Sequence, residues 1–174
     1  KLDVDKIFLP VMDRQVALVL TDVRNFGWDE NAYVLCNTKS RSLAEEKLLE
    51  FLRIVAEKDG IDLTSLIIDQ PVNNDINYRF YKIPVPYLPG KLFGKMFAGV
   101  NSKFCTLYDN YLIFGNSIPA LSKYIHANQL GNNLSSDLDF LQFSEYLASR
   151  SNIYFYLNIP ASERLMRRYL RKDM

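Results

Sequence analysis

The chain has 174 residues, 48% of them hydrophobic and 24% charged, which excludes an intrinsically disordered chain because the apolar surface is large enough to offset chain entropy. Its formal net charge is +1, from 21 basic and 20 acidic residues, and this balance argues against a nucleic-acid-binding protein. The length fits one domain, and no run approaches the roughly 20 apolar residues of a transmembrane helix.

Two strands are expected first. Residues 15–23 are apolar and β-branched on both faces, a pattern typical of a central strand. Residues 31–38 predict a second strand, and the connection between the two carries the single tryptophan, Trp28. Cys36 lies in the second strand and Cys105 in a later one, so both are expected to be buried free thiols. A disulfide between neighbouring strands is the alternative.

The clearest helix is predicted over residues 42–59. Ser42 and Glu45 have the spacing of a capping box, in which each side chain binds a free backbone N–H of the first turn. Gly60 is expected to end the helix in a left-handed conformation. Apolar residues recur between these ends at helical spacing and predict one buried stripe: Ala44, Leu48, Phe51, Leu52 and Val55.

The middle of the chain predicts two short strands around a turn. Residues 63–68 and 78–83 are the strands, and the polar sequence of residues 70–77 is typical of a turn. The three prolines between positions 84 and 89 exclude the next stretch from the interior of a sheet. One or two helical turns are expected within residues 92–97.

A hairpin and a capped helix are expected next. Residues 103–108 and 111–114 are the strands of the hairpin, and the two residues between them, Asp109 and Asn110, both tolerate positive φ. Ser117 is expected to cap a helix that runs to about residue 129.

The C-terminal part predicts a helix, a strand and another helix. Ser136 is expected to cap a helix that runs to about residue 149. Residues 152–159 predict a strand, because apolar and polar or aromatic side chains alternate along it. A last helix, with one basic side, is predicted from about residue 162.

The order of these elements predicts the fold class. Clustered strands with helices between the clusters indicate an α+β fold, with a mostly antiparallel sheet and helices packed on one face. Regular alternation of strand and helix is missing, so a doubly wound parallel sheet is not expected.

No catalytic motif is recognisable, and no cofactor or metal site is expected. His126 is the single histidine and lies in a predicted helix, which excludes a histidine-cluster metal site. The sequence has no glycine-rich phosphate loop, no dinucleotide-binding motif and no nucleophile elbow. Its carboxylates are scattered, without a local motif for the pair that a glycosidase needs.

Aromatic residues are the unusual feature, since 11 Tyr, 11 Phe and 1 Trp make up 13% of the chain. Most are expected to fill a core between sheet and helices, but exposed Tyr and Trp also suit interfaces with proteins or sugars. Within the proline-rich segment, Phe93 and Phe97 are expected to dock on the domain. The possible interaction surface comprises Trp28, Tyr33, Tyr87 and Leu88.

Three stretches carry a family resemblance: Leu-Phe-Gly-Lys-Met-Phe at 92–97, Asp-Asn-Tyr-Leu-Ile-Phe-Gly-Asn-Ser at 109–117, and Ser-Asn-Ile-Tyr-Phe-Tyr at 151–156. Over about residues 92–158 the chain resembles a family of Bacteroidetes proteins that is classified as a domain of unknown function. The resemblance implies an extracytoplasmic protein of the cell envelope, with an N-terminal membrane anchor and a long outer region of which residues 1–174 are one segment. It implies no catalytic residue and no cofactor.

From these observations we expect a non-catalytic binding or scaffolding module of a cell-envelope protein. Its partner would be a protein or a glycan, not a nucleic acid, and it would meet a membrane only through an anchor outside this chain. The alternative is a glycan-directed hydrolase that uses dispersed Asp and Glu residues.

Overall fold

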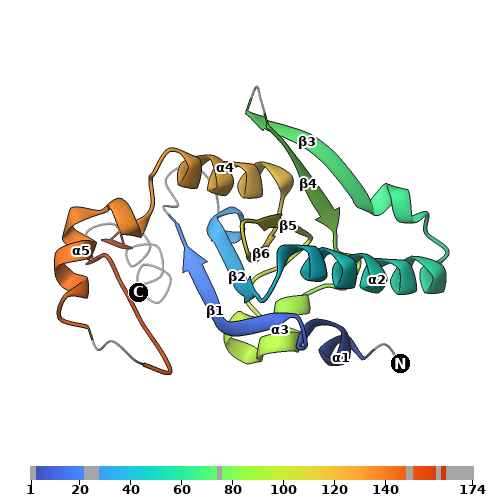
Figure 1. The fold of residues 1–174 in the computed structure, drawn as a ribbon, viewed down its shortest axis with the longest axis horizontal. Helices are drawn as coiled ribbons and strands as arrows, with labels where there is room; N and C mark the ends of the chain where they lie inside the picture. Colours follow the sequence, from blue (N-terminus) through green and yellow to red (C-terminus); the bar gives the residue numbers. More distant parts are fainter. Residues whose placement is uncertain (1–2, 22–27, 74–75, 148–150, 160–161, 164–174) are drawn as a thin grey trace, which may run out of the picture.

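A computed structural model describes residues 3–21, 28–73, 76–147, 151–159 and 162–163 of the chain (Figure 1). The elements in chain order are α1 (Val4–Phe8), β1 (Met12–Leu20), the 3₁₀ turn η1 (Trp28–Asn31), β2 (Ala32–Thr38), α2 (Arg41–Asp59), η2 (Leu63–Leu66), β3 (Ile67–Asn73), β4 (Ile76–Lys82), α3 (Leu88–Phe93), η3 (Lys95–Phe97), β5 (Phe104–Tyr108), β6 (Tyr111–Gly115), α4 (Ile118–Gln129), η4 (Leu134–Ser136) and α5 (Leu138–Ser144).

The strands form one six-stranded sheet in the order β1-β2-β6-β5-β4-β3, with every neighbouring pair antiparallel. The α+β fold class is therefore confirmed. One detail of the strand order differs from expectation, because β1 lies at an edge of the sheet and not in its centre. Its side chains pack on both faces, with Val16 and Leu18 against one core and Val19 against the other. An apolar pattern indicates that both faces of a strand are buried. It does not indicate how many neighbouring strands are hydrogen-bonded to it, so the predicted central position was wrong.

The helices cover both faces of the sheet, so the expectation that they pack on one face is corrected. Figure 1 shows α4 on one side of the sheet and α1, α2 and α3 on the other. Successive strand residues point to opposite faces, and the central strands carry large apolar side chains on both. In β2, Tyr33 faces α4 whereas Val34 belongs to the larger core under α2. A single layer of helices would leave half of these side chains in water.

Helix α2 begins one residue earlier than predicted and has a different cap. Its N-cap is Ser40, whose side chain accepts the N–H of Leu43, so the capping box of Ser42 and Glu45 is wrong. Ser40 and Ser42 both precede the apolar stripe, and which of them is the N-cap depends on the backbone conformation, which the sequence does not show. The predicted end is confirmed, since Gly60 has φ +66°.

A long hairpin replaces the turn expected over residues 70–77. Residues 63–66 form η2, strand β3 continues through Pro71 to Asn73, and β4 returns from Ile76. The polar sequence of residues 70–77 indicated a turn, but β3 is an edge strand, and an edge position tolerates Pro71.

The β5–β6 hairpin and helix α4 follow the sequence closely. Asp109 occupies the turn with φ 49°, and Ser117 caps α4 by accepting the N–H of Ala120 at 3.2 Å. Both predictions are confirmed.

The C-terminal part departs furthest from expectation. Helix α5 is capped by Asp137, not Ser136, and ends at Ser144. Residues 152–158 belong to no strand, so the strand predicted at 152–159 is wrong. Alternation alone does not make a strand when no sheet edge is paired with it. The last predicted helix lies outside the described residues except for positions 162 and 163, which are helical.

Cys36 and Cys105 are buried free thiols, as predicted. Strand β6 lies between the strands that carry them, so they are two strand spacings, about 9–10 Å, apart. A disulfide needs Cα atoms within about 7 Å, which excludes the alternative of a disulfide in this sheet. Burial raises the pKa of both thiols.

Candidate functional site

The four side chains proposed as an interaction surface separate in the structure. Tyr33 and Leu88 are fully buried, which corrects their predicted exposure. Tyr33 points into the smaller core, where its hydroxyl donates to the carbonyl oxygen of Ala120 at 3.1 Å. The side chain of Trp28 lies outside the described residues. Tyr87 alone of the four is observed at the surface, with 49% of its area exposed.

Tyr87 lies on an anchored segment that runs from the prolines to η3. Leu88 and Phe97 hold the two ends of the segment in the larger core. Gly90 lies against Ala98 so closely that a Cβ atom at position 90 would come within 2.7 Å of the Ala98 Cα atom. The rings of Phe93 and Phe97 meet edge to face, with centroids 5.7 Å apart. Residues 88–98, which follow Tyr87, are therefore held in place by packing.

The backbone of Tyr87 is strained. Its φ of 55° places it in the left-handed region, which a bulky side chain rarely occupies. It precedes α3 as the N-cap residue but makes no side-chain hydrogen bond to the helix. Strain of this kind persists only where the surrounding structure imposes it, and it is concentrated at functional sites.

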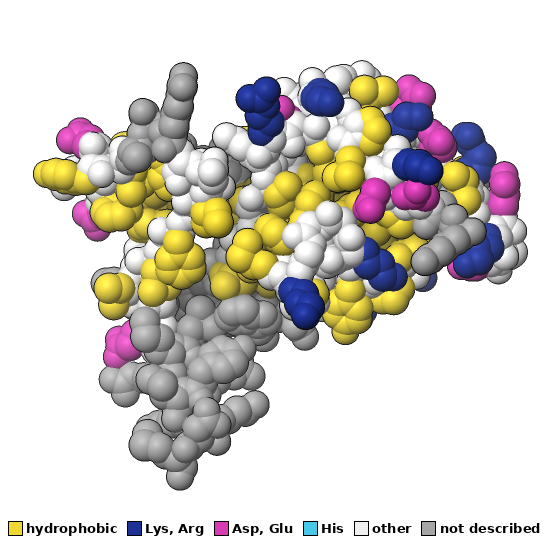
Figure 2. Space-filling view, turned by 90° about the horizontal axis from the view of Figure 1, so that it is seen from below, with side chains coloured by type: hydrophobic (Ala, Val, Ile, Leu, Met, Phe, Trp, Pro, Cys, Tyr) yellow, Lys and Arg dark blue, Asp and Glu magenta, His cyan; other side chains and the backbone are white. Residues whose placement is uncertain are grey.

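The surroundings of Tyr87 are apolar and basic. Met96 on η3 is 67% exposed. From position 82 to position 108 the sequence contains no Asp or Glu, and its four lysines are all exposed: Lys82, Lys91, Lys95 and Lys103. Figure 2 views the side of the molecule on which α3 lies, and hydrophobic side chains spread over its middle. We call the set of Tyr87, Met96 and the lysines of the same segment, Lys91 and Lys95, the Tyr87 surface. The missing acidic residues were the sequence signal for its basic part.

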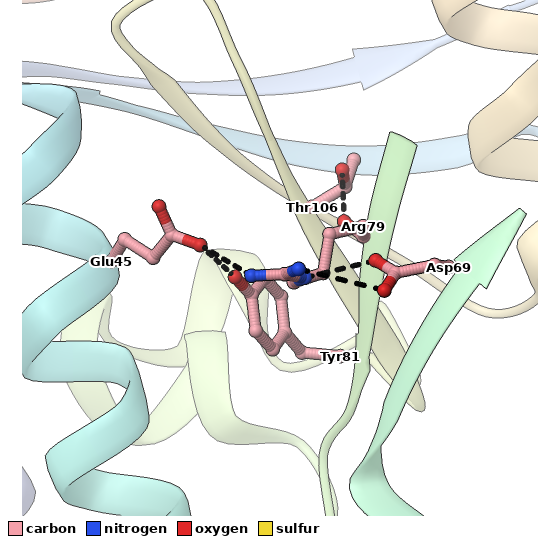
Figure 3. A network of polar contacts seen from close by, with 5 residues as sticks. All are labelled: Glu45, Asp69, Arg79, Tyr81 and Thr106. Atoms are coloured by element: carbon pink, nitrogen blue, oxygen red, sulfur yellow. Dashed lines mark hydrogen bonds and ion pairs between the residues drawn. The ribbon is translucent and has the colours of Figure 1, made fainter. Parts of the chain in front are cut away.

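A network of charged side chains joins α2 to the β3–β4 hairpin (Figure 3). Arg79 lies between two carboxylates, with Nε 2.9 Å from Asp69 Oδ1 and an η nitrogen 3.5 Å from Glu45 Oε1. The hydroxyl of Tyr81 donates to the same Glu45 oxygen at 2.5 Å. Burial, together with this carboxylate, raises the pKa of Tyr81. Thr106 donates to the carbonyl oxygen of Arg79 at 2.9 Å.

Glu45 and Asp69 are two neighbouring carboxylates, the type of pair that a glycosidase uses. A substrate must lie between the two carboxyl groups of such a pair, and here Arg79 takes that place. The arrangement holds the hairpin against α2.

A second polar cluster lies at the N-terminus of α4. Glu30 accepts hydrogen bonds from the hydroxyl of Ser117 and from Asn116 Nδ2, the latter at 3.0 Å. His126 is exposed, and it lies nine residues along α4 from Ser117, or roughly 13 Å at the rise of a helix. Cys105 points to the opposite face of the sheet from α4. His126 therefore pairs with neither Ser117 nor Cys105.

In the part of the chain that the structure describes, no group of three or more His, Cys, Asp or Glu side chains could hold a metal ion. Among the same residues no helix has the length and apolar character needed to span a bilayer.

A second apolar surface extends over the C-terminal part, which stands apart from the sheet at the left of Figure 1. Its large exposed side chains come from residues around and after α5: Leu130, Leu134, Leu138, Leu141, Phe143, Tyr146, Ile153, Tyr154, Phe155, Leu157 and Ile159.

Comparison with known proteins adds no relative: no protein-family model, no curated protein and no solved structure matches the chain.

Proposed function

We propose that this protein is a non-catalytic binding module that recognises a protein partner through the Tyr87 surface. The observation that carries the proposal is the left-handed backbone of Tyr87, which holds a half-exposed aromatic ring on a base anchored by Leu88 and Phe97. Placement in the cell envelope rests on the family resemblance alone.

The physical reason lies in the cost of ordering a contact. A flexible side chain loses rotamer freedom on binding, whereas a ring on a rigid base loses less. Left-handed backbone costs roughly 1–2 kcal/mol for a residue other than glycine, so stability alone favours another residue at position 87. Tyrosine is also among the residues that dominate binding energy in protein interfaces.

The chemistry around Tyr87 indicates the kind of partner. Exposed Met96 offers a flexible apolar contact of the sort found at protein-binding surfaces. The two lysines, Lys91 on α3 and Lys95 on η3, favour an acidic face on the partner and predict association that slows as salt is added. A glycan is the other partner class, and it would stack on the ring without needing the lysines.

Photo-crosslinking in the cells that make the protein tests the proposal. A benzoylphenylalanine at position 87 should give one discrete adduct with another protein, and the same probe at Lys58, exposed on α2, should give none. The captured protein, once purified, should bind the wild-type chain and bind the Tyr87→Ala variant at least tenfold more weakly. An adduct that a glycosidase removes would assign a glycan instead, and equal labelling at both positions would refute the surface.

The hydrolase alternative makes a different prediction. A glycan-directed hydrolase would release reducing ends from a peptidoglycan suspension, and the Glu45→Gln, Asp69→Asn double variant would lose that release. We expect no release above a heat-denatured control. No observation on the described residues favours this alternative, since Arg79 engages both carboxylates.

A further inference from the structure

The outer edge of β1 presents unpaired backbone groups. Thr21 donates its N–H to the carbonyl oxygen of Asn31, in register with the β1–β2 ladder. Residues that bond β2 alternate along the strand, so Val19 and Ala17 share this orientation. The backbone N–H and C=O groups of Val16, Leu18 and Leu20 therefore point away from β2. Within the described residues no strand pairs with them.

The first part of this edge strand carries the charged residues Asp13 and Arg14 and a register shift against β2, whereas its second part lacks such protection. Residues 15–20 contain no charge and no proline. The opposite edge, β3, differs: by the same register argument Pro71 is at a position that faces outward, and Asp69 lies two residues before it. Natural proteins protect exposed edges with proline, charge or cover. The edge of β1 is protected by none of these in residues 15–20, which leaves it competent to bind another strand.

The same chain carries a strand-like segment that belongs to no sheet. Residues 153–158 alternate Ile-Tyr-Phe-Tyr-Leu-Asn, without charge. Tyr156 lies against α5, with its ring centroid 4.9 Å from that of Phe140. The residues on either side face the opposite way: Ile153 is 79% exposed, Phe155 84% and Leu157 47%. Tyr156 thus rests on α5 while Ile153, Phe155 and Leu157 stay exposed. At the ends of the segment, the bonds of Ile153 to Ser151 Oγ and of the Asn158 carbonyl to the N–H of Ser162 would have to open when a strand forms.

We infer that residues 153–158 of one copy of this chain add as a strand to the outer edge of β1 in a second copy. The edge supplies unpaired backbone groups and the segment supplies alternating β-prone side chains, which is the complementarity of strand addition. Both surfaces are uncharged, so their approach meets no like-charge repulsion. This contact is separate from the Tyr87 surface and does not depend on the proposed function.

The two largest exposed aromatic side chains of this part of the chain supply a share of the area that a second copy would bury. Phe155, together with Tyr146 on the same part of the chain, would remove roughly 250–430 Å² from water, since an aromatic side chain buries about 150–250 Å². A stable interface needs about 800 Å² on each partner. Ile153, Leu157 and the newly paired backbone contribute to the remainder.

The contact joins two different surfaces, so it is heterologous and does not close on itself in a dimer. Each copy that donates its segment still has a free β1 edge. Sedimentation velocity on the wild-type chain, from low micromolar to submillimolar concentration, should therefore show open-ended growth in mass. A wild-type chain that stays monomeric throughout this range would overturn the inference.

Two variants and their mixture test the direction of the contact. Phe155→Lys should disable the segment, and Leu20→Lys should disable the edge; each alone should raise the dissociation constant at least tenfold. An equimolar mixture retains one working edge and one working segment, so it should form dimers and nothing larger. Ile76→Lys, on the far hairpin, is the matched control because Ile76 and Leu20 have similar exposure, 44% and 42%, and it should associate like the wild type. Failure of the mixture to form dimers would refute the proposed pairing.

Amide hydrogen exchange reports the pairing directly and does not depend on variants that fold poorly. The amides of Val16, Leu18 and Leu20 should exchange rapidly at low protein concentration and become at least tenfold slower as association proceeds. Those of Ala17 and Val19, already bonded to β2, should change little. Slow exchange of the outward amides at every concentration would mean that the same chain covers its own edge, which contradicts the inference.

Discussion

The hydroxyl of Ser117 donates a hydrogen bond to the carboxylate of Glu30, 87 positions earlier in the chain. The same hydroxyl oxygen accepts the N–H of Ala120 and so caps α4. One side chain therefore ends the loop after β6, begins a helix and ties that helix to η1, the turn that precedes β2.

Ser117→Ala should destabilise the protein by about 0.5–2 kcal/mol, because it removes the cap of α4, and the loss of the bond to Glu30 should place it near the upper end of this range. Ser42→Ala is the matched control: Ser42 lies within the first turn of α2 and does not cap it, so its effect should stay below about 0.5 kcal/mol. Urea denaturation midpoints measure both. Equal losses would contradict the assignment of the caps.

Gly90→Ala should destabilise the protein by about 1–3 kcal/mol, because the added methyl group meets the backbone of Ala98 and forces α3 from η3. Gly99→Ala tests the same chemical change a few residues away, where nothing lies within 4 Å of the added carbon. That variant should melt within a degree or two of the wild type. If the two melting temperatures fall together, the close approach at Gly90 is not what holds the segment.

Tyr87→Gly should be more stable than Tyr87→Ala by about 1 kcal/mol, since glycine adopts a φ of 55° without the penalty that alanine meets. Phe97→Ala should cost far more, about 3–5 kcal/mol, because its ring is buried in the larger core. Chemical denaturation of the three variants checks this order. A glycine variant no more stable than the alanine variant would show that Tyr87 is not strained.

Stability should fall between about pH 10 and pH 12. Burial, with a smaller effect of the nearby Glu30 carboxylate, raises the pKa of Tyr33 from its ordinary value of 10.0 to about 12. Over this window the unfolded chain releases a proton that the folded chain retains, so rising pH favours unfolding, by roughly 2–3 kcal/mol for this residue.

Tyr33→Phe removes that contribution. The variant should be less stable than the wild type near neutral pH, because the hydroxyl bonds to Glu30 and Ala120 are lost, but its stability should decline less steeply above pH 10. Denaturation midpoints measured from pH 8 to pH 11.5 would give curves that converge; curves that remain parallel would argue against a raised pKa for Tyr33.

The sequence predicted the structure correctly at positions where one residue type determines the local backbone conformation. Gly60, Asp109 and Ser117 each impose or tolerate one conformation, and each lies where the sequence placed it. Choices between equivalent residues went wrong, as when Ser40 rather than Ser42 capped α2. Pairing was not predictable in the same way, because hydrogen-bonded neighbours are set by the whole sheet. This is why β1 was expected in the centre and residues 152–159 in a strand.

The candidate site was predictable only in part. The proline-rich stretch correctly indicated a surface segment, and Tyr87 is exposed as expected. Leu88 is its neighbour in sequence yet fully buried, since the left-handed turn at Tyr87 directs the next side chain inward. Apolar side chains that pack in a core and apolar side chains that bind a partner have the same hydrophobicity, so composition alone could not distinguish Leu88 from Tyr87.

The sheet has cores of unequal size on its two faces, and among the described residues α4 is the helix that covers the smaller one. A layer held by fewer buried side chains opens at lower free energy than the rest of the molecule. We therefore expect α4 to exchange its amides through partial opening events that leave α2 and the sheet intact. The hydrogen bond from Ser117 to Glu30 then helps to hold α4 against the sheet. A change in this one contact would alter how often α4 opens and exposes the smaller core, while the fold as a whole persists.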